Sequence, residues 1–268
     1  MIMDTFAYRM QSMDMAENTI KAYMQGVGSF FKQYTELTIS NVEEWKKRLL
    51  TTNKETTVNL RVNAINKYAE IMKLELPHCK NLREKKKTYV EKVLSHDDYI
   101  YLKKSLKKDG KMTLYFAVWT MCASGARVSE LLKIQAEDYI IGHYEVKSKG
   151  GKVRRIYFPR KLCEECRRWL VEIGRTTGPV FLNRFNKVFD KSGLGRMIKK
   201  YAVRCGLNPC EVHPHAFRHR FAINFLNQKD DLSLLADILG HSSIETTRIY
   251  VRRSADEQRQ LLDAIVDW

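Results

Sequence analysis

The sequence has no long apolar run, and no stretch approaches the roughly 18 residues that a membrane-spanning helix needs. Its first 15 residues carry Asp4, Arg9 and Asp14. They lack an apolar core followed by a small-residue cleavage site, so no secretory signal is predicted. We therefore expect neither a membrane protein nor a secreted one, but a soluble protein of the cytoplasm.

Cysteines are few and irregularly spaced. Cys163 and Cys166 form a CxxC pair in a helix-like segment, and the matching pair, Cys205 and Cys210, has four residues between its members. Four thiolates could in principle hold zinc, but neither spacing suits a zinc knuckle or ribbon. We expect reduced thiols and no metal site.

The sequence also lacks the signatures of nucleotide-driven and metal-driven chemistry. It contains no GxxxxGKS/T loop to hold the phosphates of a nucleotide. It shows no compelling carboxylate cluster for two-metal catalysis, although carboxylates distant in the sequence could still meet. We predict that the protein uses no cofactor.

Positive charge is abundant. The 268 residues include 47 Lys and Arg against 31 Asp and Glu, which gives a net charge of +16. The hydrophobic fraction of 44% and the charged fraction of 29% are typical of a soluble globular protein. A surplus this large favours a polyanionic partner, and nucleic acid is the leading candidate. The alternative is a merely basic soluble protein.

The N-terminal part of the chain has a helical pattern. Apolar residues from Ile20 to Tyr34 recur at offsets of 0, 3, 4, 7, 10, 11 and 14, which is one face of a helix. A second helix is predicted from an N-cap at Ser40 or Asn41. A third is predicted over 56–72, with Pro77 stopping it. We predict a small helical domain over residues 1–79.

A basic linker is predicted over residues 80–89. It contains the densest positive run of the chain, which includes Arg83, Lys85, Lys86 and Lys87. Residues 1–88 hold 15 Lys and Arg against 10 Asp and Glu, leaving 32 against 21 in the rest, so both parts are positive. We favour a linker that tracks a DNA backbone over a passive solvated one, and we take these four side chains as DNA-binding candidates.

The second domain is predicted over residues 90–268. Ser95, with Asp98 three residues on, caps a helix; 113–123 is a buried helix that Gly125 ends; and 128–134 is helical again. Two short strands, 144–146 and 153–158, flank a Gly-Gly turn. The fold class is therefore mainly α with a small antiparallel β-sheet. Further helices are predicted over about 161–173, 192–205, 215–227, 231–239, 244–250 and 254–266.

Two motifs in the first half of this domain carry basic side chains. Arg127 follows the helix break in SGARVSELL, where it either faces a cleft or lies on the surface paired with Glu130. The Gly-Gly turn is flanked by Lys149 and Lys152. Taken alone, a lysine on a glycine turn is more often solvated than catalytic.

Two further motifs lie within 36 residues near the C-terminus. HxxR puts His215 and Arg218 on one face of a helix. LGH ends in His241, and Tyr250 follows nine residues later. The arginine fork can grip two phosphate oxygens, and a histidine can move a proton near neutral pH. A tyrosine hydroxyl, with a pKa near 10, attacks only when cations and a proton acceptor surround it.

Together the motifs resemble those of the tyrosine recombinase family, also called the λ-integrase or Xer-type recombinases. The resemblance covers residues 90–268, and more weakly the N-terminal segment, which looks like the core-binding (SAM-like) domain of the family. It rests on order, spacing and flanking apolar residues in SGARVSELL, HPHAFRHRFA and DILGHSSIETTRIY.

The resemblance implies a role for each matching residue. Arg127 and Arg218 would clamp the scissile phosphate. Lys149, or its rival Lys152, would protonate the leaving 5′-oxygen, and we favour Lys149 because it stands before the glycine. Tyr250 would form a 3′-phosphotyrosyl bond.

The remaining matches are supporting ones. His215 and His241 would hydrogen-bond the phosphate and help to move protons, and Glu130 would orient a basic neighbour. The implied enzyme cleaves and rejoins duplex DNA without metal or ATP, and exchanges strands through a Holliday junction. It would act on simple core sites, because the N-terminal segment leaves no room for an arm-binding domain.

The resemblance also implies partners. Two protomers would bind inverted half-sites, two such sites would meet in a homotetramer on nucleoid DNA, and accessory proteins are possible. The helix predicted over 254–266 either packs on its own domain or docks on a neighbouring protomer, and we favour docking. Two alternatives stay open: a type IB-like topoisomerase, and a non-catalytic DNA-binding regulator on the same scaffold.

Overall fold

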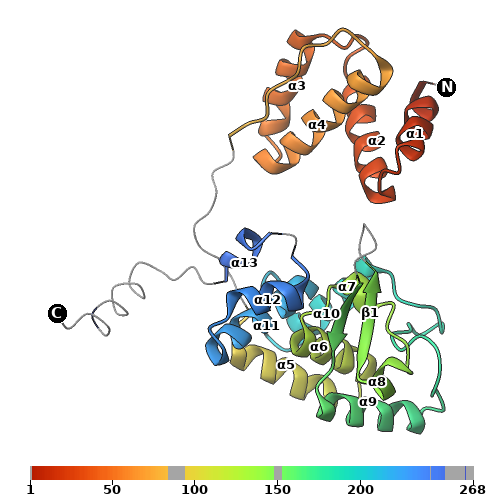
Figure 1. The fold of residues 1–268 in the computed structure, drawn as a ribbon, viewed down its shortest axis with the longest axis vertical. Coiled ribbons are helices and arrows are strands. Elements are labelled where there is room, and N and C mark those ends of the chain that lie inside the picture. The colour runs from red at the N-terminus through yellow and green to blue at the C-terminus, as the bar shows by residue number, and fades with distance from the viewer. Residues whose placement is uncertain (1, 84–93, 148–152, 242, 251–262, 264–268) are drawn as a thin grey trace. The chain divides into compact units, whose positions relative to one another are not determined.

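A computed structural model describes residues 2–83, 94–147, 153–241, 243–250 and 263. Contacts divide the chain into two compact units, Met1–Lys86 and Lys87–Trp268 (Figure 1). No helix within these described ranges is long and apolar enough to cross a membrane. The predicted helix over 254–266 and the turn carrying Lys149 and Lys152 lie outside the described residues.

The first unit is helical, as predicted, but it contains one more helix than expected. Phe6 and Met10 belong to a helix that the sequence analysis missed, and both side chains are fully buried in the core of this unit. The methionine-rich start of the chain therefore contributes to the core. The helices are α1 (Ile2–Ser12), α2 (Glu17–Phe31), α3 (Ile39–Leu50) and α4 (Glu55–Met72).

Two details of the predicted helix ends in this unit differ in the structure. The N-cap of α3 is Thr38 rather than Ser40 or Asn41, because the Thr38 hydroxyl accepts a hydrogen bond from the Asn41 backbone N–H at 3.2 Å. Helix α4 ends at Met72, as predicted, but the residue that ends it is Lys73, which adopts a left-handed conformation with φ of 56°, and not Pro77.

Asparagine side chains on α4 hold the extended chain that follows it. Asn66 accepts a hydrogen bond from the Cys79 backbone N–H and donates one to its carbonyl, both at 2.9 Å. Asn59 does the same for Leu82, at 2.7 and 3.0 Å. The chain is therefore bound to α4 as far as Leu82, beyond the predicted start of the linker, and Arg83 follows as an exposed side chain.

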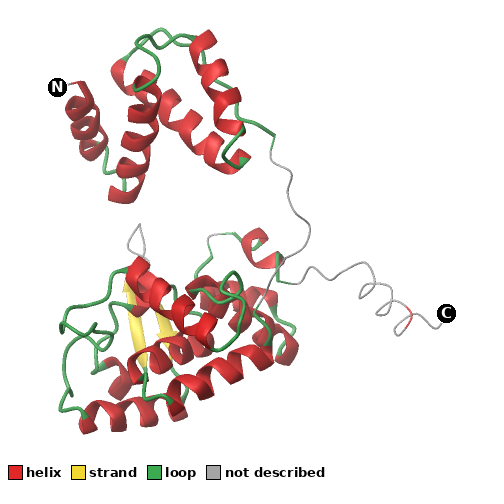
Figure 2. Cartoon of the chain, turned by 180° about the vertical axis from the view of Figure 1, so that it is seen from behind, coloured by secondary structure: helices red, strands yellow, loops and turns green. Residues whose placement is uncertain are grey.

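The second unit is mainly helical with one two-stranded antiparallel sheet, which confirms the predicted fold class (Figure 2). The strands are β1 (His143–Lys147) and β2 (Val153–Tyr157), paired from His143 with Tyr157 to Lys147 with Val153. The helices are α5 (His96–Lys108), α6 (Met112–Ser124), α7 (Val128–Leu131), α8 (Asp138–Ile141), α9 (Arg160–Glu172), α10 (Lys191–Arg204), α11 (Pro214–Gln228), α12 (Leu232–Leu239) and α13 (Glu245–Arg248).

Helix α6 is the centre of this unit. Ten of its thirteen residues are buried, and it packs against α5 and α11. The Ser95 cap is confirmed, since its hydroxyl accepts from the Asp98 backbone N–H at 3.0 Å. The helix predicted over 128–134 is too long, because α7 ends at Leu131, and α8 was not predicted at all.

Candidate active site

The break between α6 and α7 places Arg127 beside α12. Gly125 has φ of 66°, and a Cβ there would lie 2.7 Å from side-chain atoms of Leu239 and Phe221. Only glycine fits this turn. Arg127 then occupies the N-cap of α7, with 39% of its side chain exposed, and Nη2 lies 3.4 Å from the Gly240 carbonyl oxygen.

Arg127 does pair with Glu130, as the surface interpretation suggested. Its backbone N–H donates to Glu130 Oε2 at 2.7 Å, and Nη1 donates to Oε1 at 3.0 Å. The pair does not remove Arg127 from the site, because the same side chain also faces the turn after α12. Burial alone would raise the pKa of Glu130, but hydrogen bonds from Arg127 and the cationic side chain of Arg154 lower it below its usual range.

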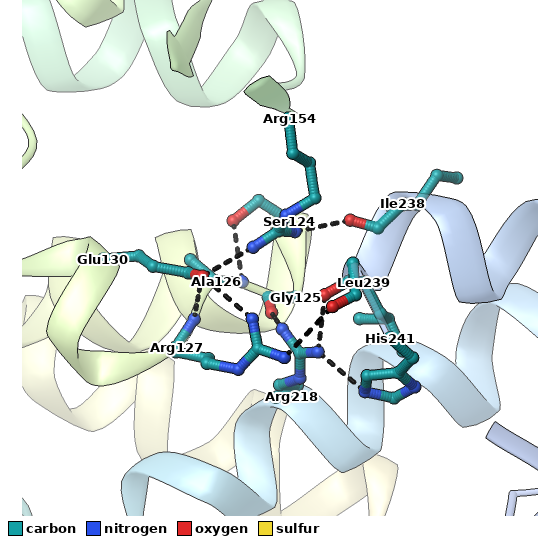
Figure 3. Close-up of polar contacts among 11 residues, drawn as sticks. Ser124, Gly125, Ala126, Arg127, Glu130, Arg154, Arg218, Ile238, Leu239 and His241 are labelled. Atoms are coloured by element: carbon teal, nitrogen blue, oxygen red, sulfur yellow. Dashed lines mark hydrogen bonds and ion pairs between the residues drawn. The ribbon is translucent and has the colours of Figure 1, made fainter. Parts of the chain in front are cut away.

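Arg218 is the most buried charge of the site, with 1% of the residue exposed. From α11 its guanidinium donates to the carbonyl oxygens of Gly125 and Leu239, both at 2.7 Å, and contacts His241 Nε2 at 2.8 Å (Figure 3). Burial and the nearby Arg127 lower the pKa of Arg218 to about 10, so it stays charged at neutral pH. Arg218 thus ties the end of α6 to the end of α12.

The contacts of His241 fix its tautomer. A guanidinium can only donate, so Nε2 accepts from Arg218, and Nδ1 carries the proton that it donates to the Thr247 hydroxyl at 2.7 Å. Burial and Arg218 lower the pKa of His241 to about 4, in keeping with a neutral ring. Thr247, which is fully buried, was not identified from the sequence.

Replacing Thr247 by Val should weaken this tautomer preference. The isosteric change leaves the Nδ1–H without its acceptor, so the balance between the two tautomers should shift by about 1 kcal/mol or more. Nitrogen NMR of the His241 ring measures the balance. Thr246→Val, at an exposed neighbouring position, is the control. An unchanged His241 spectrum in the Thr247 variant would refute the assignment.

Tyr250 lies half-buried beside two histidines, and a third lies behind one of them. Its ring is 5.1 Å from that of His219 and 6.5 Å from that of His241, and His219 lies 4.9 Å from His215. Burial raises the pKa of Tyr250, while Arg218 and Arg127 oppose the shift.

The two histidines of α11 differ in exposure. His215 is exposed, with a pKa that partial burial and Arg218 lower. His219 was not identified from the sequence, although its spacing of four from His215 puts both on one helix face. Nδ1 of His219 is buried and has no hydrogen-bond partner among the described residues.

Arg154 on β2 is a further residue that the sequence analysis missed. Its Nη2 donates to Glu130 Oε1 and its Nη1 to the Ile238 carbonyl oxygen, both at 2.6 Å. Figure 3 shows it entering the site from the side opposite Arg218. Glu130, expected to orient one basic neighbour, therefore pairs with two.

The structure brings together Arg127, Arg218, His241 and Tyr250, with Glu130 behind them and His215 at the edge. Arg83 belongs to the first unit. No group of three or more His, Cys, Asp or Glu side chains in the described part of the chain could hold a metal ion. Cys163 and Cys166 are buried in the core and form no disulfide. Lys149, Lys152, Lys85, Lys86 and Lys87 lie outside the described residues.

Known proteins share this sequence pattern and this fold. Tyrosine recombinase XerA of Pyrococcus horikoshii is 26% identical, over 99% of this chain and 95% of its own. The structure of the Tn1549 transposon integrase in complex with transposon right end DNA superposes with a TM-score of 0.74 at 16% identity, covering 98% of this chain and 99% of that one. A λ integrase dimer bound to a core site gives 0.74 at 15% identity, covering 93% of each chain.

The model of the phage integrase family matches residues 90–257. This range contains every side chain of the site described above. The match to the family model also confirms the resemblance that the motifs indicated. The chain therefore belongs to the phage integrase family, the family of the tyrosine recombinases.

Proposed function

We propose that this protein is a site-specific DNA recombinase that uses Tyr250 to cleave and rejoin duplex DNA through a 3′-phosphotyrosyl intermediate. The observation that carries the proposal is a convergence. Arg127, Arg218 and His241 come from α7, α11 and the turn after α12. Arg218 contacts His241, and Arg127 and Arg218 reach the adjacent carbonyls of Gly240 and Leu239. Tyr250 packs beside His241.

The proposed reaction exchanges one phosphodiester bond of the DNA for a bond between the phosphate and Tyr250. The Tyr250 oxygen attacks the scissile phosphorus, the P–O5′ bond breaks, and Lys149 gives its proton to the leaving 5′-oxygen. Arg127 and Arg218 donate to the non-bridging oxygens, where negative charge develops. The phenolic proton passes to a neutral histidine nearby. The reverse steps rejoin a new strand without ATP, because the phosphotyrosyl bond keeps the energy of the phosphodiester.

The same proposal covers the partners. The first unit would act as the core-binding domain, residues 83–89 as the basic linker, and residues 90–268 as the catalytic domain. Two protomers would occupy inverted half-sites, and two sites would pair in a tetramer that resolves a Holliday junction in the nucleoid. DNA in the structures of the Tn1549 and λ integrases supports duplex DNA as the partner.

Strand exchange tests the proposal against the topoisomerase alternative. A binding site is first selected from a library of inverted repeats, and two copies of it are placed on a supercoiled plasmid. The protein is then incubated with this plasmid in EDTA and without ATP. We expect recombinant circles that depend on both sites. Relaxation with no exchange of strands would favour a topoisomerase, and binding without any covalent adduct would favour a regulator.

A further inference from the structure

Two adjacent arginines on β2 point to opposite faces of the sheet. The side chain of Arg154 is 11% exposed and shares a face with buried Ile156, as alternation along a strand requires. The side chain of Arg155 is 54% exposed and pairs with Glu145 across the sheet at 2.9 Å. An arginine on the buried face costs desolvation energy, so its contacts there need an explanation.

The guanidinium of Arg154 is bound by other parts of the protein. Nη1 and Nη2 are both engaged at 2.6 Å, by the Ile238 carbonyl oxygen and by Glu130. A Cβ added to Gly240 would lie 2.5 Å from Arg154 Nε, so the left-handed glycine after α12 leaves room for the arginine. Arg154 therefore supports the site from behind rather than offering its fork to DNA.

A second arginine holds one partner of Arg154, and an arginine also holds the carbonyl next to the other partner. Glu130 is also held by Arg127, and the carbonyl of Leu239, next to Ile238, is held by Arg218. Within the described ranges, Arg154 is the side chain whose hydrogen bonds join β2 to α7 and α12. Without Arg154, Arg127 and Arg218 would keep their own hydrogen bonds, but the sheet would lose its side-chain hydrogen bonds to α7 and α12.

We infer that Arg154 is a positioning residue that holds the β1–β2 hairpin against Arg127 and Arg218. It thereby sets where the lysine between the strands meets the leaving oxygen. The inference rests on the proposed function. It follows because Lys149 and Lys152 both lie in the five-residue connection between the two strands. A shift of the hairpin would move the proton donor while the phosphate clamp stayed assembled.

The test compares two DNA substrates. Arg154→Met removes the hydrogen bonds but keeps an apolar stem, and Arg155→Met is the matched control on the exposed face. One duplex carries the natural 5′-oxygen at the cleaved bond. The other carries sulfur there. A thiolate leaves without a proton, since a thiol has a pKa of about 8.5, whereas an alkoxide needs one.

We expect Arg154→Met to form the covalent adduct about 100-fold more slowly than the unaltered chain on the oxygen substrate, the size of loss that a misplaced group produces. On the sulfur substrate the loss should shrink to the order of threefold, because leaving-group protonation is no longer needed. Arg155→Met should behave like the unaltered chain on both.

Two outcomes would overturn the inference. Equal losses on both substrates would mean that Arg154 acts through the clamp and not through the hairpin, and losses no larger than those of Arg155→Met would mean that it positions nothing. For each variant, the rate of adduct formation on the oxygen substrate is divided by the rate on the sulfur substrate. Because both rates come from the same protein, this ratio does not depend on the fraction that is folded. Arg154→Lys supplies the same ratio if the methionine variant fails to fold. No adduct from the unaltered chain on either substrate would instead refute the proposed function.

Discussion

Replacing Tyr250 by Phe should abolish the covalent DNA adduct, with adduct formation falling at least about 10⁴-fold, as for other lost nucleophiles. The change removes only the hydroxyl. The ring contacts with His219 and His241 and the packing against α11 and α12 are kept, so DNA binding and thermal stability should stay close to those of the unaltered chain. Adduct on a nicked suicide duplex is followed by denaturing electrophoresis.

Tyr101→Phe is the matched control, since Tyr101 is an exposed tyrosine on α5 of the same unit. It should form adduct at the unaltered rate. Persistent adduct in the Tyr250 variant would show that another side chain is the nucleophile. Loss of DNA binding in that variant would show that the hydroxyl contributes to recognition as well as to chemistry.

Replacing Arg218 by Met should damage both catalysis and stability. Cleavage should fall about 10³-fold, the loss expected when a buried donor to a developing charge is removed. The carbonyls of Gly125 and Leu239 lose this donor, which should cost about 2–5 kcal/mol of unfolding free energy. For a unit of this size the melting temperature should drop by about 10 °C. Adduct rates and thermal melting measure the two effects separately.

Arg204→Met provides the comparison. Its side chain is 69% exposed and forms an ion pair with Asp109 at 3.4 Å. A surface ion pair of this kind contributes little to stability. It should leave both quantities nearly unchanged. A stable Arg218 variant would contradict the structural role that the hydrogen bonds indicate, and one that still cleaves would remove Arg218 from the proposed clamp.

The sequence was sufficient to predict the site residues that lie in motifs. Arg127, Arg218, His241 and Tyr250 were named from motifs that resemble those of the tyrosine recombinases. The structure brings them together although 122 residues lie between the first and the last. The fold class followed from apolar periodicity. The interpretation of Arg127 as a surface residue paired with Glu130 was half right, because the pair exists and yet faces the site.

The residues missed from the sequence act through tertiary contacts. Thr247 carries no signal until His241 is placed beside it, and its hydroxyl then selects the histidine tautomer. Arg154 left a weak signal, since strand alternation puts it on the same face as Ile156. Helix α1 was missed because two buried side chains, Phe6 and Met10, gave too short a pattern to recognise.

The central claim is that Tyr250 attacks the scissile phosphate, and mass spectrometry of the trapped adduct tests it most directly. The unaltered chain is incubated with a suicide duplex, digested with nuclease and protease, and its peptides are sequenced. We predict that the remnant of the 3′-phosphate is attached to the Tyr250 side chain. A remnant on any other residue, or DNA cleavage with no covalent peptide, would contradict the account.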